Sequence, residues 1–391
     1  MVGHRGSNIA VMCLAPSRRT PNAARRWLQG KIMAGHEAGR QRPAGIRDVA
    51  RMAGVSVASA SFALNGQPGV AQDTRRRILA VAAELGYRAN TQAQALRRGR
   101  TTTYGIVVRN FANPFFLEVL SGAEEVAGEF GATLLLLDSR YSAERERRHV
   151  QEMAAQRLAG LAIASVGTGE SIRMWQELRP GAPVVALNTS VAHAAGVSRV
   201  CPDNAAAVEL PLRRLAELGH TCVGFLSAPR RLMADPDRLK HFRRLAPELG
   251  LRARVMSSPL TLADVRQCAL TVLAGHDAPT AIITNSDYTA GAVYKATREL
   301  GLRVGPDVSV VGHDDLPTSE LLDPPLATIV LDGREMGRTL MRRLLGQDPP
   351  GDYVAPVELV ERASLQAPGI PCSPGVHQAA GPTAGSRAST R

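Results

Sequence analysis

Residues 48–66 read DVARMAGVSVASASFALNG, and this stretch decides the fold of the N-terminal part of the chain. Apolar residues recur at helical spacing on both sides of a break formed by Gly54, Val55 and Ser56. Gly54 suits the backbone of a tight turn, Val55 can fill the angle between two helices, and Ser56 is a preferred helix cap. The stretch therefore predicts two short helices joined by a tight turn, a helix-turn-helix. An ordinary helical hairpin within a larger domain is the alternative.

The second of these helices, predicted from Ser56 to Asn65, consists mostly of Ser, Ala and Val. Small side chains allow a helix to approach the floor of the major groove of DNA closely. Serine hydroxyls can also donate to phosphates, which fixes the register of a protein on the duplex without reading its sequence. The composition of this helix therefore suits contact with DNA, and the ordinary helical hairpin stays open as the alternative.

Positive charge is concentrated at the same end of the chain. The 391 residues have a formal net charge of +12, and residues 1–104 hold 17 Lys and Arg against four Asp and Glu. The remaining residues are nearly balanced, with 30 basic against 31 acidic side chains. A basic end on a neutral body favours an anionic partner, either nucleic acid or an acidic membrane surface.

The pattern divides the chain into five segments with different expected structures. We expect a flexible basic extension at residues 1–44, followed by three short helices with the helix-turn-helix at residues 45–87. A polar linker at residues 88–103 should lead into a two-lobed α/β domain at residues 104–365, and a disordered tail should follow at residues 366–391.

The long C-terminal domain is predicted from apolar strands that alternate with amphipathic helices. The strand candidates are YGIVV, ATLLLLD, LAGLAIA, APVVALN, CVGFLS, ARVMS, PTAIIT, VSVVGHD and LATIVL, in chain order from residue 104 to residue 331. This alternation is typical of doubly wound parallel sheets. About 260 residues are too many for one such sheet, so we expect two lobes.

Several other classes of protein and site are disfavoured. The five cysteines lack metal-ligand or paired spacing, which indicates free thiols in a reducing cytosol and neither a metal nor another cofactor. No apolar run reaches the ~18 residues that span a bilayer, and residues 9–15 are short for a secretory signal. We therefore expect a cytoplasmic protein without a membrane partner. Phosphate-binding and hydrolase motifs are also missing, which argues against an enzyme.

The ordered series of motifs resembles the LacI/GalR family of bacterial transcription regulators. The resemblance begins with IRDVARMAGVSVASASFALNG and TRRRILAVAAELGYRAN, and continues through NPFF, ELGH, NSDYTAGA, ELGLRVGPDVSVVGHDDL and DPPLATI. It covers roughly residues 45–364 in the usual order and spacing of the family. The fold it implies is an all-α helix-turn-helix headpiece followed by a two-lobed core like that of periplasmic binding proteins.

For the N-terminal part, the resemblance implies a homodimer that binds a pseudo-palindromic operator in double-stranded DNA. The second helix of each headpiece would enter the major groove, and a hinge helix after the headpiece would place Leu96 as a wedge in the minor groove. The expected DNA-binding residues are Ser56, Val57, Ala58, Ser59, Ser61, Phe62, Asn65, Leu96 and Arg97. Val57, Ala58 and Phe62 depart from the hydrogen-bonding residues usual at the base-reading positions, so the operator sequence stays open.

For the core, the resemblance implies a small-molecule effector between the two lobes. Polar and aromatic residues that follow strands are the candidates, because open α/β sheets bind ligands beyond the carboxyl ends of their strands. The expected effector-binding residues are Phe115, Phe116, Asp203, Arg238 and Asp287. Each phenylalanine could instead be core, and Asp287 could instead complement the start of a helix.

The function implied is a DNA-binding transcription regulator, a repressor, that responds to a small polar effector. A sugar or sugar derivative is favoured by the mixture of arginine and carboxylate, and purines are also bound in this family. The alternative is a two-lobed solute-binding protein of the periplasmic type without a DNA-binding role. A nucleotide-dependent enzyme is the second alternative.

Overall fold

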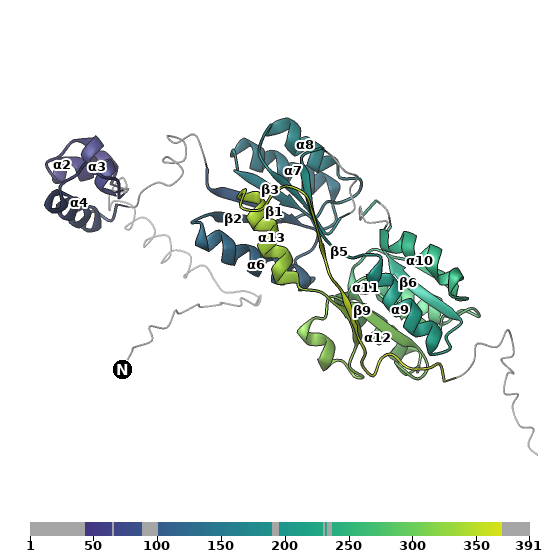
Figure 1. Ribbon diagram of the computed structural model, residues 1–391. Helices are drawn as coiled ribbons and strands as arrows, with labels where there is room; N and C mark the ends of the chain where they lie inside the picture. The colour runs from purple at the N-terminus through teal and green to yellow at the C-terminus, as the bar shows by residue number, and fades with distance from the viewer. Residues whose placement is uncertain are drawn as a thin grey trace, which may run out of the picture. The chain divides into compact units, whose positions relative to one another are not determined.

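The computed structural model describes residues 44–64, 66–87, 101–189, 195–229, 231–232 and 237–369. The predicted N-terminal extension, the linker with Leu96 and Arg97, the position Asn65 and most of the predicted tail lie outside the described residues. The chain forms two compact units, Met1–Gln94 and Ala95–Arg391, and Figure 1 shows the helices and sheets of each.

The first unit has the three predicted helices, α2 (Ile46–Met52), α3 (Val57–Leu64) and α4 (Gln72–Glu84). The turn between α2 and α3 forms as expected, since Gly54 adopts φ +63° and the Val55 N–H donates to the Ala50 carbonyl at 3.0 Å. The core is small and consists mainly of alanine methyl groups around Ile78, which is fully buried. Small side chains in this core allow three short helices to pack closely.

The second unit contains two six-stranded sheets, one in each lobe. The first lobe has the strand order β11-β5-β4-β3-β1-β2 with every pairing parallel. Its strands are β1 (Thr103–Val108), β2 (Thr133–Asp138), β3 (Gly160–Ile163), β4 (Val184–Leu187), β5 (Val197–Pro202) and β11 (Asp352–Ala355). Its helices are α6 (Phe115–Glu129), α7 (Ala143–Ala155), α8 (Glu170–Leu178) and α13 (Gly333–Leu344).

The second lobe has the strand order β12-β10-β9-β8-β6-β7, and only β12 runs antiparallel to its neighbour. Its strands are β6 (Cys222–Ser227), β7 (Arg252–Ser257), β8 (Ala281–Ile283), β9 (Ser309–His313), β10 (Ala327–Val330) and β12 (Glu358–Val360). Its helices are α9 (Ala206–Glu217), α10 (Asp237–Glu248), α11 (Leu262–Leu273), α12 (Asp287–Glu299) and the short 3-10 helix η1 (Pro317–Leu321).

The structure confirms the two doubly wound sheets and all nine predicted strands, and adds three strands that the sequence did not indicate. The added strands β5, β11 and β12 alternate polar with apolar residues or are very short, so they lack the apolar run of a strand buried on both faces. The chain passes between the lobes three times, after β5, after β10 and after β11.

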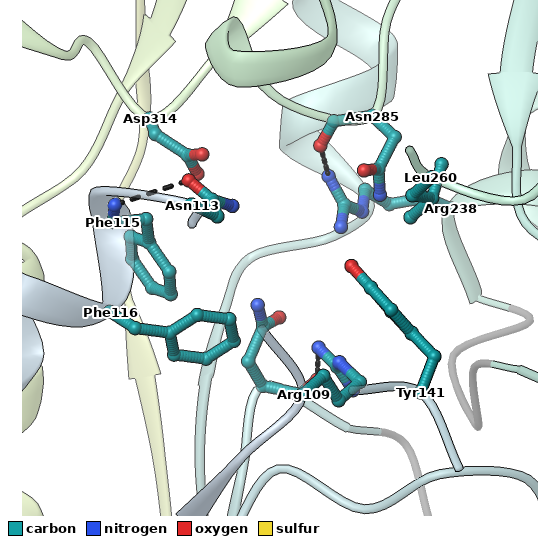
Figure 2. A pocket seen from close by; sticks show the side chains of 10 residues that line it. Arg109, Asn113, Phe115, Phe116, Tyr141, Arg238, Leu260, Asn285 and Asp314 are labelled. Atoms are coloured by element: carbon teal, nitrogen blue, oxygen red, sulfur yellow. Dashed lines mark hydrogen bonds between the residues drawn. The ribbon is translucent and has the colours of Figure 1, made fainter. Parts of the chain in front are cut away.

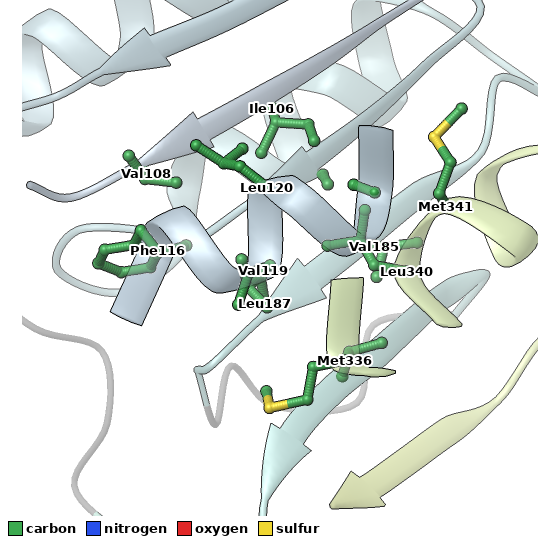
Figure 3. Packing of buried hydrophobic residues seen from close by; sticks show 14 of the residues in the cluster. Ile106, Val108, Phe116, Val119, Leu120, Val185, Leu187, Met336, Leu340 and Met341 are labelled. Carbon is green, nitrogen blue, oxygen red and sulfur yellow. The ribbon is translucent and has the colours of Figure 1, made fainter. Parts of the chain in front are cut away.

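The core of the first lobe joins helices from distant parts of the sequence. Figure 3 shows α6 and α13 side by side, with Val119 and Leu340 in one buried cluster. A Cβ atom on Gly122 would lie 1.9 Å from the carbonyl oxygen of Arg334, and one on Gly337 would lie 1.9 Å from that of Val119. The two helices therefore touch backbone to backbone, and only glycine fits at either position.

Candidate functional site

The outer face of α3 in the first unit is apolar and uncharged. Val57 and Phe62 are 41% and 44% exposed, and Ala58 is exposed beside them, whereas Ala60 and Ala63 point into the core. Exposed apolar side chains that gather on one face of a helix can mark a contact surface. This face therefore has the character of a contact surface, and it carries the side chains predicted to meet base edges.

The serines of the same helix hold its first turn. The Ser59 N–H donates to Ser56 Oγ at 3.0 Å, and the two hydroxyl oxygens are 2.9 Å apart. This confirms the predicted cap at Ser56 and leaves both hydroxyls near the exposed end of the helix. Exposed arginines surround the turn and the adjoining helices, at positions 47, 51, 76 and 77. Such arginines can neutralise phosphates on either side of a groove.

The second unit contains a pocket of about 310 Å³ of empty space, part of which is open to solvent. Polar, charged and aromatic side chains line it, and Figure 2 shows them converging from several loops. The lining residues are Arg109, Asn113, Phe115, Phe116, Tyr141, Asn188, Arg238, Leu260, Asn285 and Asp314.

The strand ends of both sheets place most of these side chains. Arg109 directly follows β1, Asn188 follows β4, Asn285 follows β8 by two residues and Asp314 directly follows β9. All four strands are parallel, so their carboxyl ends point to one edge of each sheet. The pocket thus occupies the position that open α/β sheets use for ligands.

Two buried guanidinium groups face the pocket from opposite lobes. Arg109 donates from Nη1 to the Ser165 carbonyl at 3.3 Å and from Nη2 to the Asn188 carbonyl at 3.0 Å. Arg238 donates from Nη1 to the Asn285 carbonyl at 3.1 Å. These bonds hold each guanidinium plane in place, as Figure 2 shows for both residues. Planar groups fixed in this way suit a ligand that offers paired oxygen acceptors.

Arg109 has further support from a buried carboxylate behind it. Glu146 of α7 accepts from the Ser165 hydroxyl at 3.0 Å and from the Val166 N–H at 2.7 Å. Burial raises the pKa of Glu146, and these hydrogen bonds and the charge of Arg109 lower it again in part. The turn at 165–166, whose carbonyl accepts from Arg109, is therefore held in place from the side away from the pocket.

Asp314 brings a carboxyl group to the pocket in an unusual environment. Its side chain is only 5% exposed, and Oδ1 lies 2.8 Å from His313 Nδ1. Within the described residues Oδ2 has no hydrogen-bond partner. Burial raises the pKa of Asp314 to about 8, although Arg238 and Asn113 act in the opposite direction. At neutral pH this carboxyl group therefore holds a proton and can donate as well as accept.

Three lining residues adopt backbone conformations that are rare for side-chain-bearing residues. Tyr141, Asn188 and Asp314 have φ values of +55°, +43° and +116°. Such conformations cost of order 1–3 kcal/mol each and cluster at binding sites, where surrounding structure maintains them. Asn188 Oδ1 is also buried without a partner among the described residues. The pocket thus presents strained, preorganised polar groups with unused hydrogen-bonding capacity.

The two phenylalanines predicted to contact an effector are core residues that also line the pocket. Phe115 and Phe116 are almost fully buried in the core of the first lobe, and both also line the pocket. Their rings meet edge to face, with centroids 5.4 Å apart and an interplanar angle of 61°. They form an apolar wall of the pocket, with Arg238 and Asn285 on the far side.

The expected effector contacts at Asp203 and Asp287 need correction, because neither residue lines the pocket in the described structure. Asp203 Oδ1 accepts from the N–H groups of Ala205 and Ala206 at 3.1 and 3.0 Å, so it serves the start of α9. Asp287 is turned inward and is engaged in buried hydrogen bonds. Arg238, another expected effector contact, lines the pocket.

Sequence reasoning missed most of the polar lining. The missed polar residues are Arg109, Asn113, Tyr141, Asn188, Asn285 and Asp314. A usable signal was present, because most of them stand one to five residues after an apolar strand.

Within the described residues, no group of three His, Cys, Asp or Glu side chains is placed to hold a metal ion. No described helix is long and apolar enough to cross a membrane.

Comparison with known protein families gives two matches. Residues 45–90 match the model described as bacterial regulatory proteins, lacI family, and residues 212–365 match a periplasmic binding protein-like domain. A solute-binding protein without a DNA-binding role does not account for the first match, so the regulator is supported over that alternative.

Individual relatives agree with these matches. The chain is 32% identical over 342 residues to the HTH-type transcriptional regulator MalR of Streptomyces coelicolor, covering 83% of this chain and 97% of the relative. It is 28% identical to the HTH-type transcriptional repressor PurR of Photobacterium profundum, covering 77% and 90%. These relatives are named as regulators of transcription and not as enzymes.

Solved structures of the same architecture also match. A lac repressor dimer bound to operator and the anti-inducer ONPF superposes with a TM-score of 0.74 at 27% identity, covering 83% of this chain and 100% of the repressor. A complex of the transcriptional regulator CelR with cellobiose superposes with a TM-score of 0.61 at 26% identity, covering 82% and 99%. With its helix-turn-helix unit and two-lobed core, the chain belongs to the lacI family of bacterial regulatory proteins and is a DNA-binding regulator of transcription.

Proposed function

We propose that the protein is a homodimeric repressor in the cytoplasm whose affinity for a pseudo-palindromic operator is controlled by a small polar effector, a sugar or sugar derivative. The observation that carries this proposal is the pocket in the second unit, in which guanidinium, amide and carboxyl groups from both lobes face two aromatic rings. One ligand in this pocket would contact both lobes and so bias how they close.

The chemistry of the lining favours a carbohydrate. Hydroxyl groups of a sugar can both donate and accept, which suits Asn188 Oδ1 and the carboxyl group of Asp314 as well as the arginine donors. The apolar C–H face of a sugar ring can lie on an aromatic wall such as Phe115 and Phe116. The names of relatives point the same way, since one is the ribose operon repressor of Halalkalibacterium halodurans and CelR is in complex with cellobiose.

The DNA contact is proposed for the outer face of α3 and its flanking serines. Val57, Ala58 and Phe62 stand exposed on this face, and apolar side chains can recognise the methyl groups of thymine. Ser56, Ser59 and Ser61 would then contact phosphates near the start of the helix. The proposal also retains the DNA contacts predicted from the sequence for Asn65, Leu96 and Arg97, which lie outside the described residues.

Effector and operator must influence each other reciprocally. If an effector changes operator affinity by some factor, the operator changes effector affinity by the same factor. A ligand achieves this only through a difference in affinity between two lobe arrangements. Contacts from both Arg109 and Arg238 provide such a difference, because the two residues belong to different lobes.

A thermal-shift screen tests the effector assignment. The panel contains D-glucose, D-galactose, D-ribose, cellobiose, D-gluconate and hypoxanthine, each added to the full chain and to two variants. Arg238→Leu removes a lining guanidinium, and Arg244→Leu on the same helix removes an exposed one that pairs with Glu248. At 100 times its Kd an effector stabilises the folded state by about 2.7 kcal/mol.

We expect at least one carbohydrate to raise the melting temperature of the parent chain and of Arg244→Leu but not of Arg238→Leu. If a carbohydrate still raised the melting temperature of Arg238→Leu, the effector would not bind in this pocket. Stabilisation by hypoxanthine alone would exclude the sugar class.

Selection of binding sites from random duplex DNA tests the operator assignment. The full chain should enrich an inverted repeat, and Phe62→Ala should lose that enrichment. Leu79→Ala is the matched control, because Leu79 is 47% exposed on α4 and is similarly apolar. The assignment of α3 as the helix that contacts base edges would be contradicted if both variants enriched the inverted repeat equally. It would also be contradicted if the parent chain enriched no sequence.

A further inference from the structure

A buried carboxylate group lies in the second lobe, directly behind the turn that carries Asp314. Asp287, the first residue of α12, is 5% exposed. Its Oδ2 accepts from the Leu316 N–H at 2.9 Å and from Ser319 Oγ at 2.6 Å, and its Oδ1 accepts from Thr328 Oγ1 at 2.6 Å. One side chain thereby ties the start of α12 to η1, to β10 and to the turn after β9.

The surrounding backbone is shaped to admit this carboxylate. A Cβ atom on Gly312 of β9 would lie 1.9 Å from Asp287 Oδ1, so only glycine leaves room for the oxygen. The cap of α12 is supplied separately by Ser286, whose hydroxyl accepts from the Thr289 N–H. Asp287 is therefore not needed to start the helix, and its burial has another cause.

The turn that Asp287 holds is conformationally strained. Asp314 and Asp315 both have positive φ, +116° and +50°, and they immediately precede Leu316. The Asp314 N–H donates to the Ile329 carbonyl at 2.8 Å, and the Leu316 N–H donates to Asp287. The strained pair is thus fixed at both ends, as such conformations require.

The same turn faces two parts of the site. Asp314 lines the pocket, and Leu316 is buried in the core cluster of the first lobe that also contains Phe115 and Phe116. A shift of the turn would therefore move a pocket carboxyl group and an apolar contact beneath the aromatic wall together. Asp287 is the buried polar anchor of this turn on the side of the second lobe.

We propose that Asp287 is a positioning residue of the effector pocket: its carboxylate fixes the turn at residues 314–316 and so sets the direction and charge state of Asp314. This inference rests on the proposed function in that Asp314 belongs to the effector pocket. Asp287 itself does not contact the effector. Its role is to keep the binding geometry formed before an effector arrives.

The charges of the two carboxyl groups are linked. Asp287 accepts three hydrogen bonds, which suits an ionised carboxylate, whereas Asp314 Oδ2 accepts none among the described residues. Burial raises the pKa of Asp287, the nearby Asp314 raises it further, and the three hydrogen bonds lower it again in part. Repulsion between the two groups therefore opposes ionising both. A negative Asp287 therefore favours the protonated form of Asp314, and removal of that charge lowers the pKa of Asp314.

Other ionisable and polar groups also face the pair. Arg238 of α10 and the Asn113 side chain act on Asp314, and His313 of β9 is hydrogen-bonded to it. Tyr141 interacts with Asp314, and Tyr294 of α12 interacts with Asp287. None of these groups is itself replaced in Asp287→Asn, so the only ionisable group removed from the cluster is Asp287.

The test uses Asp287→Asn, which is nearly isosteric but replaces one acceptor oxygen with an N–H donor group. Asp264→Asn is the matched control, because Asp264 is an exposed first-turn carboxylate on the neighbouring helix α11. The first readout is hydrogen exchange of the segment 314–319 in the full chain without effector. We expect exchange there to become at least tenfold faster in Asp287→Asn, and unchanged in Asp264→Asn.

The second readout is the charge state of Asp314. The stability difference between each background and its Asp314→Asn derivative is measured against pH, and the pH at which the difference levels off reports the pKa of Asp314. We expect this pH to fall by one unit or more in Asp287→Asn and to stay in place in Asp264→Asn. Loosening alone would also lower this pH, because burial raises the pKa of Asp314. Ser319→Ala weakens the same anchor but keeps the charge of Asp287, so it is measured beside Asp287→Asn and should move this pH less.

Unchanged exchange at 314–319, or an unchanged levelling pH, would overturn the proposal. If Asp287→Asn does not fold, Ser319→Ala removes one donor to Asp287 and should give smaller changes in the same directions. Neither readout uses an effector. Failure of the sugar panel would therefore refute the proposed effector class and leave this result standing, whereas failure here would leave the panel result standing.

Discussion

The Asp314→Asn substitution should change how the stability of the chain depends on pH. The pKa of Asp314 is about 8 in the folded chain, against an ordinary value of 3.8. The folded chain therefore keeps a proton on this carboxyl group up to about pH 8, whereas the unfolded chain releases it near pH 4. Folding stability must fall as pH rises through this interval and level off above it.

The size of the effect follows from the pKa difference of about 4 units. Each unit corresponds to 1.36 kcal/mol, so the full loss approaches about 5 kcal/mol, of which roughly 4 kcal/mol falls between pH 5 and pH 8. Asparagine keeps the shape and donates a hydrogen bond but does not titrate. The free energy of unfolding of Asp314→Asn should therefore rise, relative to that of the parent chain, by about 1.4 kcal/mol for each pH unit up to pH 8.

Urea unfolding of the full chains, followed by circular dichroism at pH 5, 6, 7, 8 and 9, measures this difference. Asp307→Asn is the control, because an exposed pair with Arg303 lowers the pKa of Asp307 to about 2. A lowered carboxyl pKa changes the pH dependence of stability only below pH 4. The difference in the free energy of unfolding between this control and the parent chain should therefore stay constant over the whole series. A constant difference between Asp314→Asn and the parent from pH 5 to pH 8 would show that the carboxyl group titrates normally.

Four further outcomes are expected. Ser56→Ala should destabilise the first unit by about 0.5–2 kcal/mol, because the cap of α3 is lost, and should lower its melting temperature by circular dichroism. Phe116→Leu should weaken effector binding about two- to tenfold in calorimetry while keeping the fold, since it removes an aromatic face and retains apolar volume. Gly122→Ala should cost about 1–3 kcal/mol in urea unfolding, because the added methyl group meets the backbone of α13, and full stability would contradict the close packing. Leu96→Ala should weaken operator binding more than binding to random duplex in gel-shift titrations, and equal losses would refute a minor-groove wedge.

Local sequence was enough to predict the first unit and the strands of the main sheets. Gly54 and Ser56 act within one turn of the chain, so the break and the cap follow from nearest neighbours. The apolar strands of both lobes are buried on both faces, and such strands appear as uninterrupted apolar runs. Strand β11 has no such run, because it pairs at the edge of its sheet with β5, about 150 residues earlier.

The pocket was less accessible to sequence reasoning because its side chains are oriented by distant partners. Asp287 follows a strand and opens a helix, the pattern expected of a ligand contact. Its direction depends on donors at Leu316, Ser319 and Thr328, up to 41 residues away, and these turn it inward. Asp314, which directly follows β9, is instead the carboxyl group that reaches the pocket.

The three passages of the chain between the lobes have a consequence for synthesis on the ribosome. The lobe that is translated first needs α13 to cover α6 and β11 to complete its sheet. Its fold therefore cannot be completed until Ala355 has been synthesised. The other lobe has β6 to β10 complete by Val330. A nascent chain of that length lacks the helix that covers the apolar side of α6, so this side stays exposed to water until α13 has been synthesised.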